Sequence, residues 1–118
     1  MKENILKEKS FSLAPDIVNL YKQVCFESKE FILARQVLRS GNSIGANIRE
    51  AEYAESRADF IHKLSIALKE ANETEYWLDL LHQSHFLNGD TYDDTRPKVE
   101  EQKRMLTSII NSTRKNNY

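Results

Sequence analysis

The sequence predicts an all-α fold, a single-domain four-helix bundle whose helices run antiparallel in up-down-up-down order. Four segments carry apolar residues at three- and four-residue steps, which places those side chains on one face of an α-helix. The 118 residues include three glycines and two prolines, too few for a turn-rich β protein. Short connections between the segments favour antiparallel neighbours. The length suits one domain with its own buried core.

Composition and charge argue against a strongly basic protein, a disulfide-linked secreted protein and a membrane-spanning protein. The net charge is -1, from 17 basic and 18 acidic residues, so nucleic-acid binding requires a local basic patch. The single cysteine, Cys25, cannot form an intrachain disulfide and is typical of a reducing compartment. The amino terminus lacks the apolar run of a signal peptide, and no stretch is long and apolar enough to span a membrane. We therefore expect a cytoplasmic protein without a membrane partner.

The first helix follows a charged amino-terminal segment. We expect residues 1–9 to form a flexible tail and residues 10–115 to form the bundle. Ser12 is the expected N-cap of a helix ending near Glu27, with Pro15 in its first turn, where the missing N–H is harmless. The apolar stripe of this helix comprises Phe11, Leu13, Ala14, Ile17, Val18, Leu20, Tyr21, Val24 and Cys25.

The second helix is expected from near Glu30 to Ala54 or Glu55, and it carries two glycines in its middle. Gly41 and Gly45 should each cost about 1 kcal/mol relative to alanine in a helix interior. A helix that keeps glycine at this cost is expected to offer a smooth surface where a neighbouring helix comes close. Its buried stripe comprises Ala34, Val37, Leu38, Gly41, Ile44, Gly45, Ile48 and Ala51.

The third helix begins at a predicted capping box. Ser56 is the expected N-cap, and Asp59 three residues later completes a weaker variant of the box. The helix continues towards the Asn88-Gly89-Asp90 turn. Its inner face comprises Phe60, Ile61, Leu64, Ala67, Leu68, Ala71, Leu78 and Leu81.

The fourth helix contains Pro97, for which two arrangements are open. Either a helix beginning at Asp90 kinks at Pro97, or one turn over Thr91–Thr95 precedes a main helix from Arg96. Residues 116–118 are expected to be disordered. The inner face of this helix comprises Tyr92, Val99, Leu106, Ile109 and Ile110.

The segment Ser43-Ile-Gly-Ala-Asn-Ile-Arg-Glu50 resembles the Ser-Ile-x-Ala-Asn-Ile-x-Glu signature of the bacterial ribosomal RNA intervening-sequence proteins. The third helix is also similar, in Asp59–Leu68 followed by Glu73 and Glu75, and the resemblance covers roughly residues 11–113. It implies an antiparallel four-helix bundle in a ring-shaped homopentamer, without enzymatic activity or cofactor. For a related accessory protein of diversity-generating retroelements, it implies binding of nucleic acid and of a reverse transcriptase.

The chain departs from this family pattern in three respects. Gly45 replaces the proline that is common after Ser-Ile, and Lys69-Glu70 replace a Gly-Ser pair of the third helix. Many relatives are distinctly basic, whereas this chain is not. The last difference bears directly on nucleic-acid binding, which depends on positive charge.

A polar stripe on one face of the second helix is the candidate nucleic-acid surface. The stripe comprises Arg35, Arg39, Asn42 and Arg49. Arginine presents several donors that suit phosphate oxygens. The alternative is a solvated face paired with acids such as Glu52. Arg114 and Lys115 form a second basic patch, although bases at the end of a helix also complement its dipole without any ligand.

Two further groups of residues are expected to have structural roles. Asn47, Glu50 and Glu73 are expected to join the second and third helices by buried hydrogen bonds, rather than to form a ligand or catalytic cluster. Ile66 and Trp77 lie on a second apolar seam of the third helix. Because aromatic residues are enriched at interfaces, these two are candidate oligomer contacts.

Metal binding is the weakest functional hypothesis. Asp59 precedes His62 and Asp79 precedes His82 by three residues, a step at which a carboxylate and a histidine can share a metal. The acid is Asp rather than the Glu of di-iron bundles, and both pairs lie on one helix. We therefore expect no metal site. The leading hypothesis is a non-enzymatic oligomer that binds RNA, DNA or a nucleic-acid enzyme, and the alternative is a protein-interaction scaffold that binds no nucleic acid.

Overall fold

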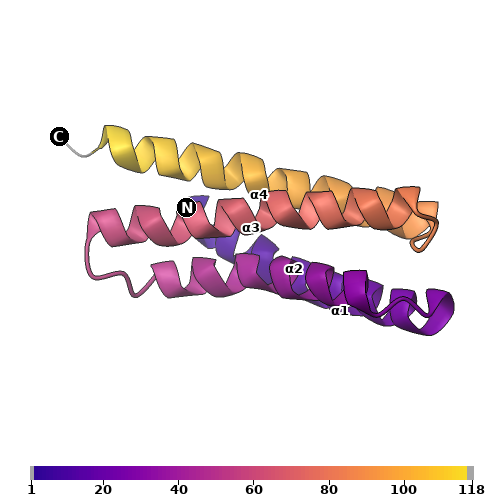
Figure 1. The fold of residues 1–118 in the computed structure, drawn as a ribbon. Coiled ribbons are helices and arrows are strands. Elements are labelled where there is room, and N and C mark those ends of the chain that lie inside the picture. Colours follow the sequence, from indigo (N-terminus) through magenta and orange to yellow (C-terminus); the bar gives the residue numbers. More distant parts are fainter. Residues whose placement is uncertain (1, 117–118) are drawn as a thin grey trace.

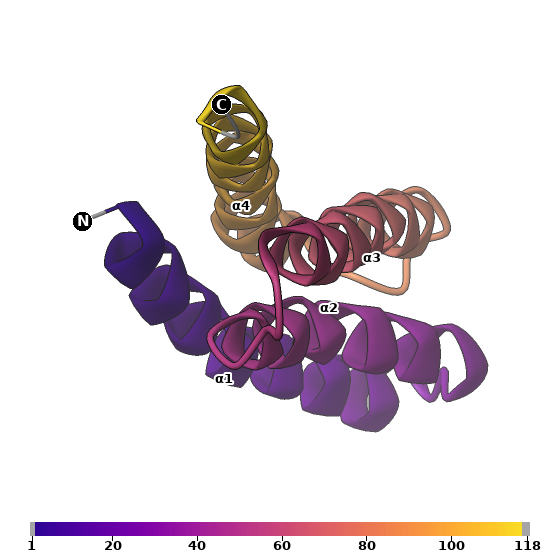
Figure 2. The ribbon, with the colours of Figure 1, turned by 90° about the vertical axis from the view of Figure 1, so that its left-hand side faces the viewer.

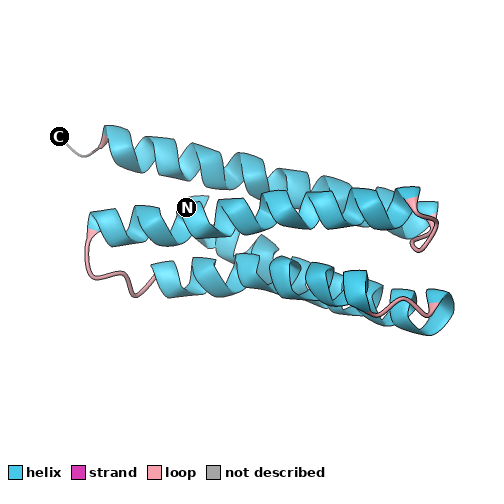
Figure 3. Cartoon of the chain, in the orientation of Figure 1, coloured by secondary structure: helices cyan, strands magenta, loops and turns pink. Residues whose placement is uncertain are grey.

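The computed structural model describes residues 2–116, which form four long α-helices and no strand (Figure 3). The α1–α2 and α3–α4 connections lie at one end of the molecule, on the right in Figure 1, and the α2–α3 connection lies at the other end. The predicted all-α class and the four helices are confirmed. Their bounds are α1 (Lys2–Ser28), α2 (Ile32–Ala51), α3 (Arg57–Gln83) and α4 (Gly89–Lys115).

The four helices enclose a single apolar core. Each helix packs against the next one in the chain, and α1 also packs against α4, which closes the bundle (Figure 2). The molecule is elongated, with extents of 51 × 21 × 20 Å, and the core follows its long axis. Within the described part of the chain, no helix is long and apolar enough to cross a membrane. The largest fully buried apolar side chains include Leu6, Ile17, Leu20, Ile44, Leu64, Leu78, Leu81 and Leu106.

The amino-terminal segment is helical, and the prediction of a flexible tail over residues 1–9 is wrong for its described part. Helix α1 begins at Lys2 because Leu6 continues the apolar stripe seven residues before Leu13 and is only 1% exposed. Pro15 therefore lies in the interior of α1, on its exposed side, rather than in the first turn. Phe11, expected in the stripe, is instead 64% exposed.

The two glycines of α2 have different surroundings. A Cβ atom on Gly41 would lie 2.7 Å from Cγ2 of Ile17 on α1, closer than side-chain atoms approach each other. Gly41 therefore allows α1 and α2 to pack closely, as predicted. A Cβ atom on Gly45 would lie 3.5 Å from the backbone oxygen of Ser10, an ordinary contact, so α1 also lies beside Gly45 but leaves room there for a methyl group.

Side-chain caps set two of the helix starts. The Ser56 hydroxyl accepts a hydrogen bond from the Asp59 N–H at 3.0 Å, which confirms the predicted cap of α3. The Asp59 carboxylate accepts from the N–H of Glu55 at 3.1 Å, one residue earlier than in a capping box. The Asn88 side chain accepts from the Thr91 N–H at 2.8 Å and caps α4.

Helix α4 is one continuous helix with Pro97 inside it, so no separate turn over Thr91–Thr95 precedes a main helix. At its other end, Asn116 is the C-cap, and its backbone N–H donates to the oxygens of Arg114 and Ser112. Of the predicted disordered end, residues 117–118 lie outside the described residues.

Candidate functional site

The candidate stripe on α2 carries two arginines without a carboxylate partner. Arg35 and Arg49 are exposed, and among residues 2–116 neither forms an ion pair. Arg39 differs, because it binds two carboxylates of α3, Glu70 at 3.2 Å and Glu73. The positive charge of Arg39 is thus balanced across the α2–α3 contact, and the outward charge of the stripe depends on Arg35 and Arg49.

A groove lies beside the stripe, between α1 and α2. Its volume is about 410 Å³, and Gly45 and Ala46 are among the residues that line it. At the edge of the groove, the guanidinium carbon of Arg49 lies 5.3 Å from the centre of the Phe11 ring, which is a cation–π contact. Asn42 also lines the groove, and its buried Oδ1 has no hydrogen-bond partner in the described chain.

The second basic patch lies apart from Arg35. Arg114 and Lys115 are exposed in the last turn of α4, where positive charge complements the helix dipole. In Figure 1 α4 ends on the left, whereas α2 starts on the right, so the fold does not bring this patch together with Arg35.

The predicted polar cluster of Asn47, Glu50 and Glu73 does not form. Asn47 donates hydrogen bonds to the backbone oxygen and hydroxyl of Ser43, at 2.9 and 3.0 Å, within its own helix. Glu50 pairs with Lys63 of α3 at 3.3 Å, and Glu73 binds Arg39 instead. Both acids link α2 to α3, but they do so through separate surface ion pairs, because charged side chains remain in water unless several partners surround them.

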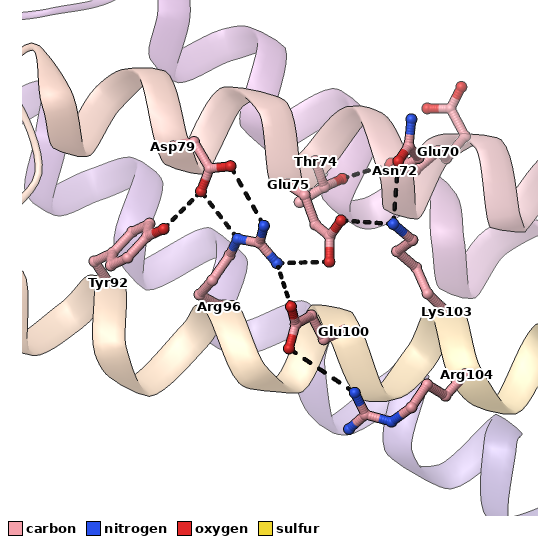
Figure 4. Close-up of polar contacts among 10 residues, drawn as sticks. All are labelled: Glu70, Asn72, Thr74, Glu75, Asp79, Tyr92, Arg96, Glu100, Lys103 and Arg104. Atoms are coloured by element: carbon pink, nitrogen blue, oxygen red, sulfur yellow. Dashed lines mark hydrogen bonds and ion pairs between the residues drawn. The ribbon is translucent and has the colours of Figure 1, made fainter.

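Arg96 of α4 is held by two carboxylates of α3, as Figure 4 shows. Its Nη1 lies 2.6 Å from Glu75, whose side chain is only 9% exposed, and its Nε lies 2.9 Å from Asp79. Lys103 adds a second ion pair to Glu75 at 2.7 Å. The Tyr92 hydroxyl donates to Asp79 at 2.6 Å. We call these five residues the α3–α4 clasp. The cations in it stabilise the buried Glu75 carboxylate, which would be costly to bury without such partners.

The clasp changes the protonation behaviour of its members. Hydrogen bonding from Arg96 holds the pKa of the Asp79 carboxyl below its ordinary value. The pKa of the Tyr92 phenol is raised, because its proton is held by Asp79. His82 stacks on Tyr92 with ring centres 4.1 Å apart.

The two Asp–His pairs considered for metal binding have other partners. Asp79 accepts hydrogen bonds from Arg96 and Tyr92, and Asp59 accepts one from the N–H of Glu55. Within residues 2–116, no three His, Cys, Asp or Glu side chains are grouped so that they could hold a metal ion.

Ile66 and Trp77 are both half-buried on α3. The Trp77 indole N–H donates to Glu73 at 2.9 Å, and the ring packs against the core. Its neighbour Tyr76 makes an edge-to-face contact with it, with ring centres 5.0 Å apart, and is 59% exposed. Tyr76 is therefore the more accessible aromatic of this seam.

Residues 2–108 match a protein-family profile, and this match covers nearly all of the bundle. The family is described as 23S rRNA-intervening sequence protein. The chain belongs to this family. The resemblance of the Ser43–Glu50 segment is thereby confirmed.

A solved structure of the same kind supports the fold of this intervening-sequence protein. It is a protein of unknown function from the S23 ribosomal protein family of Bacteroides thetaiotaomicron VPI-5482, with 56% sequence identity and a TM-score of 0.91. The match covers 94% of this chain and 99% of the other. No curated protein matches the chain. The comparisons therefore give the family and the fold, and they assign no activity.

Sequence reasoning missed two features of this family member. Glu75 falls on the inner face of α3, between Ala71 and Leu78, and an acid inside an apolar stripe signals a buried ion pair. Tyr76 gave no comparable signal, because exposure of one aromatic residue depends on which helices cover it.

Proposed function

We propose that this intervening-sequence protein is a non-enzymatic, antiparallel up-down-up-down bundle that forms a cytoplasmic ring of five copies and binds RNA or DNA through repeated basic faces. One observation carries the nucleic-acid part of the proposal: Arg35 and Arg49 lie exposed on one face of α2 without carboxylate partners in the described chain. The family resemblance supports the ring. A reverse transcriptase is the protein partner that the retroelement relative suggests.

The mechanism is repeated weak phosphate contact. Arginine side chains that contact phosphates position the nucleic acid without reading its bases, so binding should be largely independent of sequence. Each neutralised phosphate releases counterions, so affinity should fall steeply with salt. Five copies of Arg35 on one ring would combine through effective concentration, which compensates for the low charge of each chain.

The test compares Arg35→Gln with a matched control, Arg39→Gln, in titrations with mixed-sequence RNA and DNA at several salt concentrations. Arg35→Gln should weaken binding and lower the slope of log affinity against log salt by about 1 for each phosphate that is no longer neutralised. Arg39→Gln should have a smaller effect, since Glu70 and Glu73 already balance that charge. Equal binding by wild type and Arg35→Gln would remove the basic-face proposal.

The second candidate function is a protein-interaction scaffold that binds no nucleic acid. It is favoured by the number of cations already engaged by carboxylates, among them Lys7 with Glu52 and Lys98 with Asp16. The net charge of -1 agrees with it. Absence of binding by wild type even at low salt would select this function.

A further inference from the structure

The exposed phenylalanines of residues 2–116 all belong to one pair of helices. Phe11 and Phe26 lie on α1, Phe31 directly precedes α2, and each is half or more exposed. Leaving an aromatic ring in water forgoes the gain of burying it. Single exposed apolar side chains are common, but rings gathered on two neighbouring helices indicate a contact surface.

The two rings on α1 share one exposed stripe with a cation. Phe11 and Phe26 are about 22 Å apart along the helix and about 60° apart around it. Lys22 lies between them on the same side, is exposed, and forms no ion pair within residues 2–116. Glu27 follows Phe26 but lies about 100° further around the helix. The stripe therefore carries ring, cation and ring in order, rather than one continuous apolar patch.

The two free arginines of α2 lie level with these rings along the bundle. The guanidinium carbon of Arg49 is 5.3 Å from the centre of the Phe11 ring. Phe26 lies two residues before the end of α1, and the α1–α2 connection is short, so Phe26 is near the first turn of α2, which contains Arg35 (Figure 1). Phe31 is one turn before Arg35, whose backbone N–H donates to the Phe31 oxygen at 3.2 Å. Each exposed ring thus has a cation without a carboxylate partner close to it.

We propose that this surface binds single-stranded nucleic acid, with unpaired bases stacked on Phe11, Phe26 and Phe31 and with phosphates on the cations beside them. The inference rests on the proposed function and names its substrate class. Every base has a flat face, so aromatic side chains beside a positively charged path bind single strands with little dependence on sequence. Bases inside a duplex are already stacked on one another and cannot reach the rings. The groove beside Phe11 is lined by the small residues Gly45 and Ala46, which leave room for a base.

The charges around the rings favour an anionic polymer over an apolar partner. An apolar partner needs a continuous apolar centre, whereas here rings alternate with cations. The acid next to Phe31 is already engaged, because the Glu30 carboxylate accepts hydrogen bonds from the backbone N–H groups of Leu33 and Ala34, at 2.7 and 3.1 Å.

Tyr76 of α3 is the contrasting case. Its ring is also exposed, but the residues three before and three after it are Glu73 and Asp79. Acids at these steps lie on the same side of the helix and repel phosphates. Tyr76 therefore provides a matched control, an exposed ring that should not bind a base.

The test measures the affinity of wild type and variants for three labelled DNA probes of about 15 nucleotides. The probes are a mixed-sequence single strand, its duplex, and a single strand of the same length without bases. Phe11→Leu and Phe26→Leu keep an apolar side chain but remove the ring, and Tyr76→Leu is the control. All three positions are exposed, so each variant should keep the helical circular dichroism of the wild type.

Wild type should bind the ordinary single strand about tenfold or more tightly than the strand without bases, because each stacked base adds affinity. Phe11→Leu and Phe26→Leu should each weaken single-strand binding by about fivefold or more. They should leave the salt slope unchanged, since the phosphate contacts remain. Neither variant should alter binding to the duplex or to the strand without bases, and Tyr76→Leu should bind every probe like wild type.

Several results would overturn base stacking and leave the basic-face proposal in place. These are equal wild-type affinity for the two single strands, unchanged single-strand binding by either phenylalanine variant, and an equal loss with Tyr76→Leu. A loss of duplex binding as large as the loss of single-strand binding would also overturn it, because the rings would then act on the fold or the assembly rather than on bases. If wild type binds no probe even at low salt, the proposed function fails and this inference fails with it.

Discussion

At the scale of single residues, Gly41 determines how closely two helices approach. Its missing side chain allows Ile17 of α1 to pack directly on the backbone of α2. Gly45, one turn later, has space for a methyl group, although both glycines carry the same cost in helix propensity. The same residue type thus serves the internal packing at one position and borders an open groove at the other.

Gly41→Ala should destabilise the fold by about 1 to 3 kcal/mol, because the added methyl group overlaps the branched part of the Ile17 side chain. This loss should exceed the helix-propensity gain of about 1 kcal/mol. Gly89→Ala is the matched control, since no atom lies within 4 Å of its Cβ position, and it should be neutral or slightly stabilising. Urea unfolding of both variants measures the difference, and equal stability would mean that α1 and α2 can separate at little cost.

At the scale of helices, α1 shows how one apolar residue extends an element. Lys2–Lys9 are mostly charged and polar, yet they continue the helix because Leu6 reaches the core. Helix formation in proteins depends more on burying an apolar face than on the propensity of each residue. The first turns of α1 should therefore contribute to stability rather than fray.

Leu6→Ala should lower the free energy of unfolding by about 2 to 5 kcal/mol, because it removes a fully buried side chain and leaves a cavity. Ile5→Ala is the control, since Ile5 is 47% exposed and its loss should have little effect. Urea denaturation of the two variants at equal protein concentration provides the comparison. A small loss for Leu6→Ala would indicate that the start of α1 detaches from the bundle without unfolding it.

The α3–α4 clasp should make stability depend on pH. The pKa of Asp79 is lower in the folded chain than in the unfolded one, where it is about 3.9. Its contribution is therefore complete above about pH 4 and is lost as pH falls through the lower folded value. Wild type should exceed Asp79→Asn in stability at neutral pH, and the difference should shrink below about pH 4. A difference that stays constant between pH 7 and pH 3 would contradict this role of Asp79.

At the scale of the whole molecule, ion pairs between helices balance several of the basic side chains on the surface. Lys9 pairs with Glu101, Lys98 with Asp16, and Arg39 with two acids of α3. These contacts are exposed and individually weak. Each pair nevertheless balances a positive charge that an external anion would otherwise meet.

The proposed ring predicts that unfolding depends on protein concentration. Subunits that bind only in the folded state stabilise it by mass action, so the midpoint of thermal unfolding should rise with concentration. Light scattering at micromolar concentration should give five times the mass of one chain. A monomer mass, together with a midpoint that is independent of concentration, would exclude the ring.

The sequence by itself determined the features that depend on neighbouring residues. The apolar periodicity gave four helices, and Ser56 with Asp59 gave the start of α3, because a cap is completed within three residues. The signature from Ser43 to Glu50 gave the family. Each of these signals can be read without knowing which helices are neighbours.

The tertiary structure decided what depends on contacts between distant segments. It paired Arg39 with Glu70 and Glu73, thirty or more residues away, and so removed one charge from the predicted stripe. It likewise placed Arg96 between two acids of α3 and left the groove beside Gly45 open. Helical periodicity states which residues share a face, but only the packing of helices states which atoms from another helix meet that face.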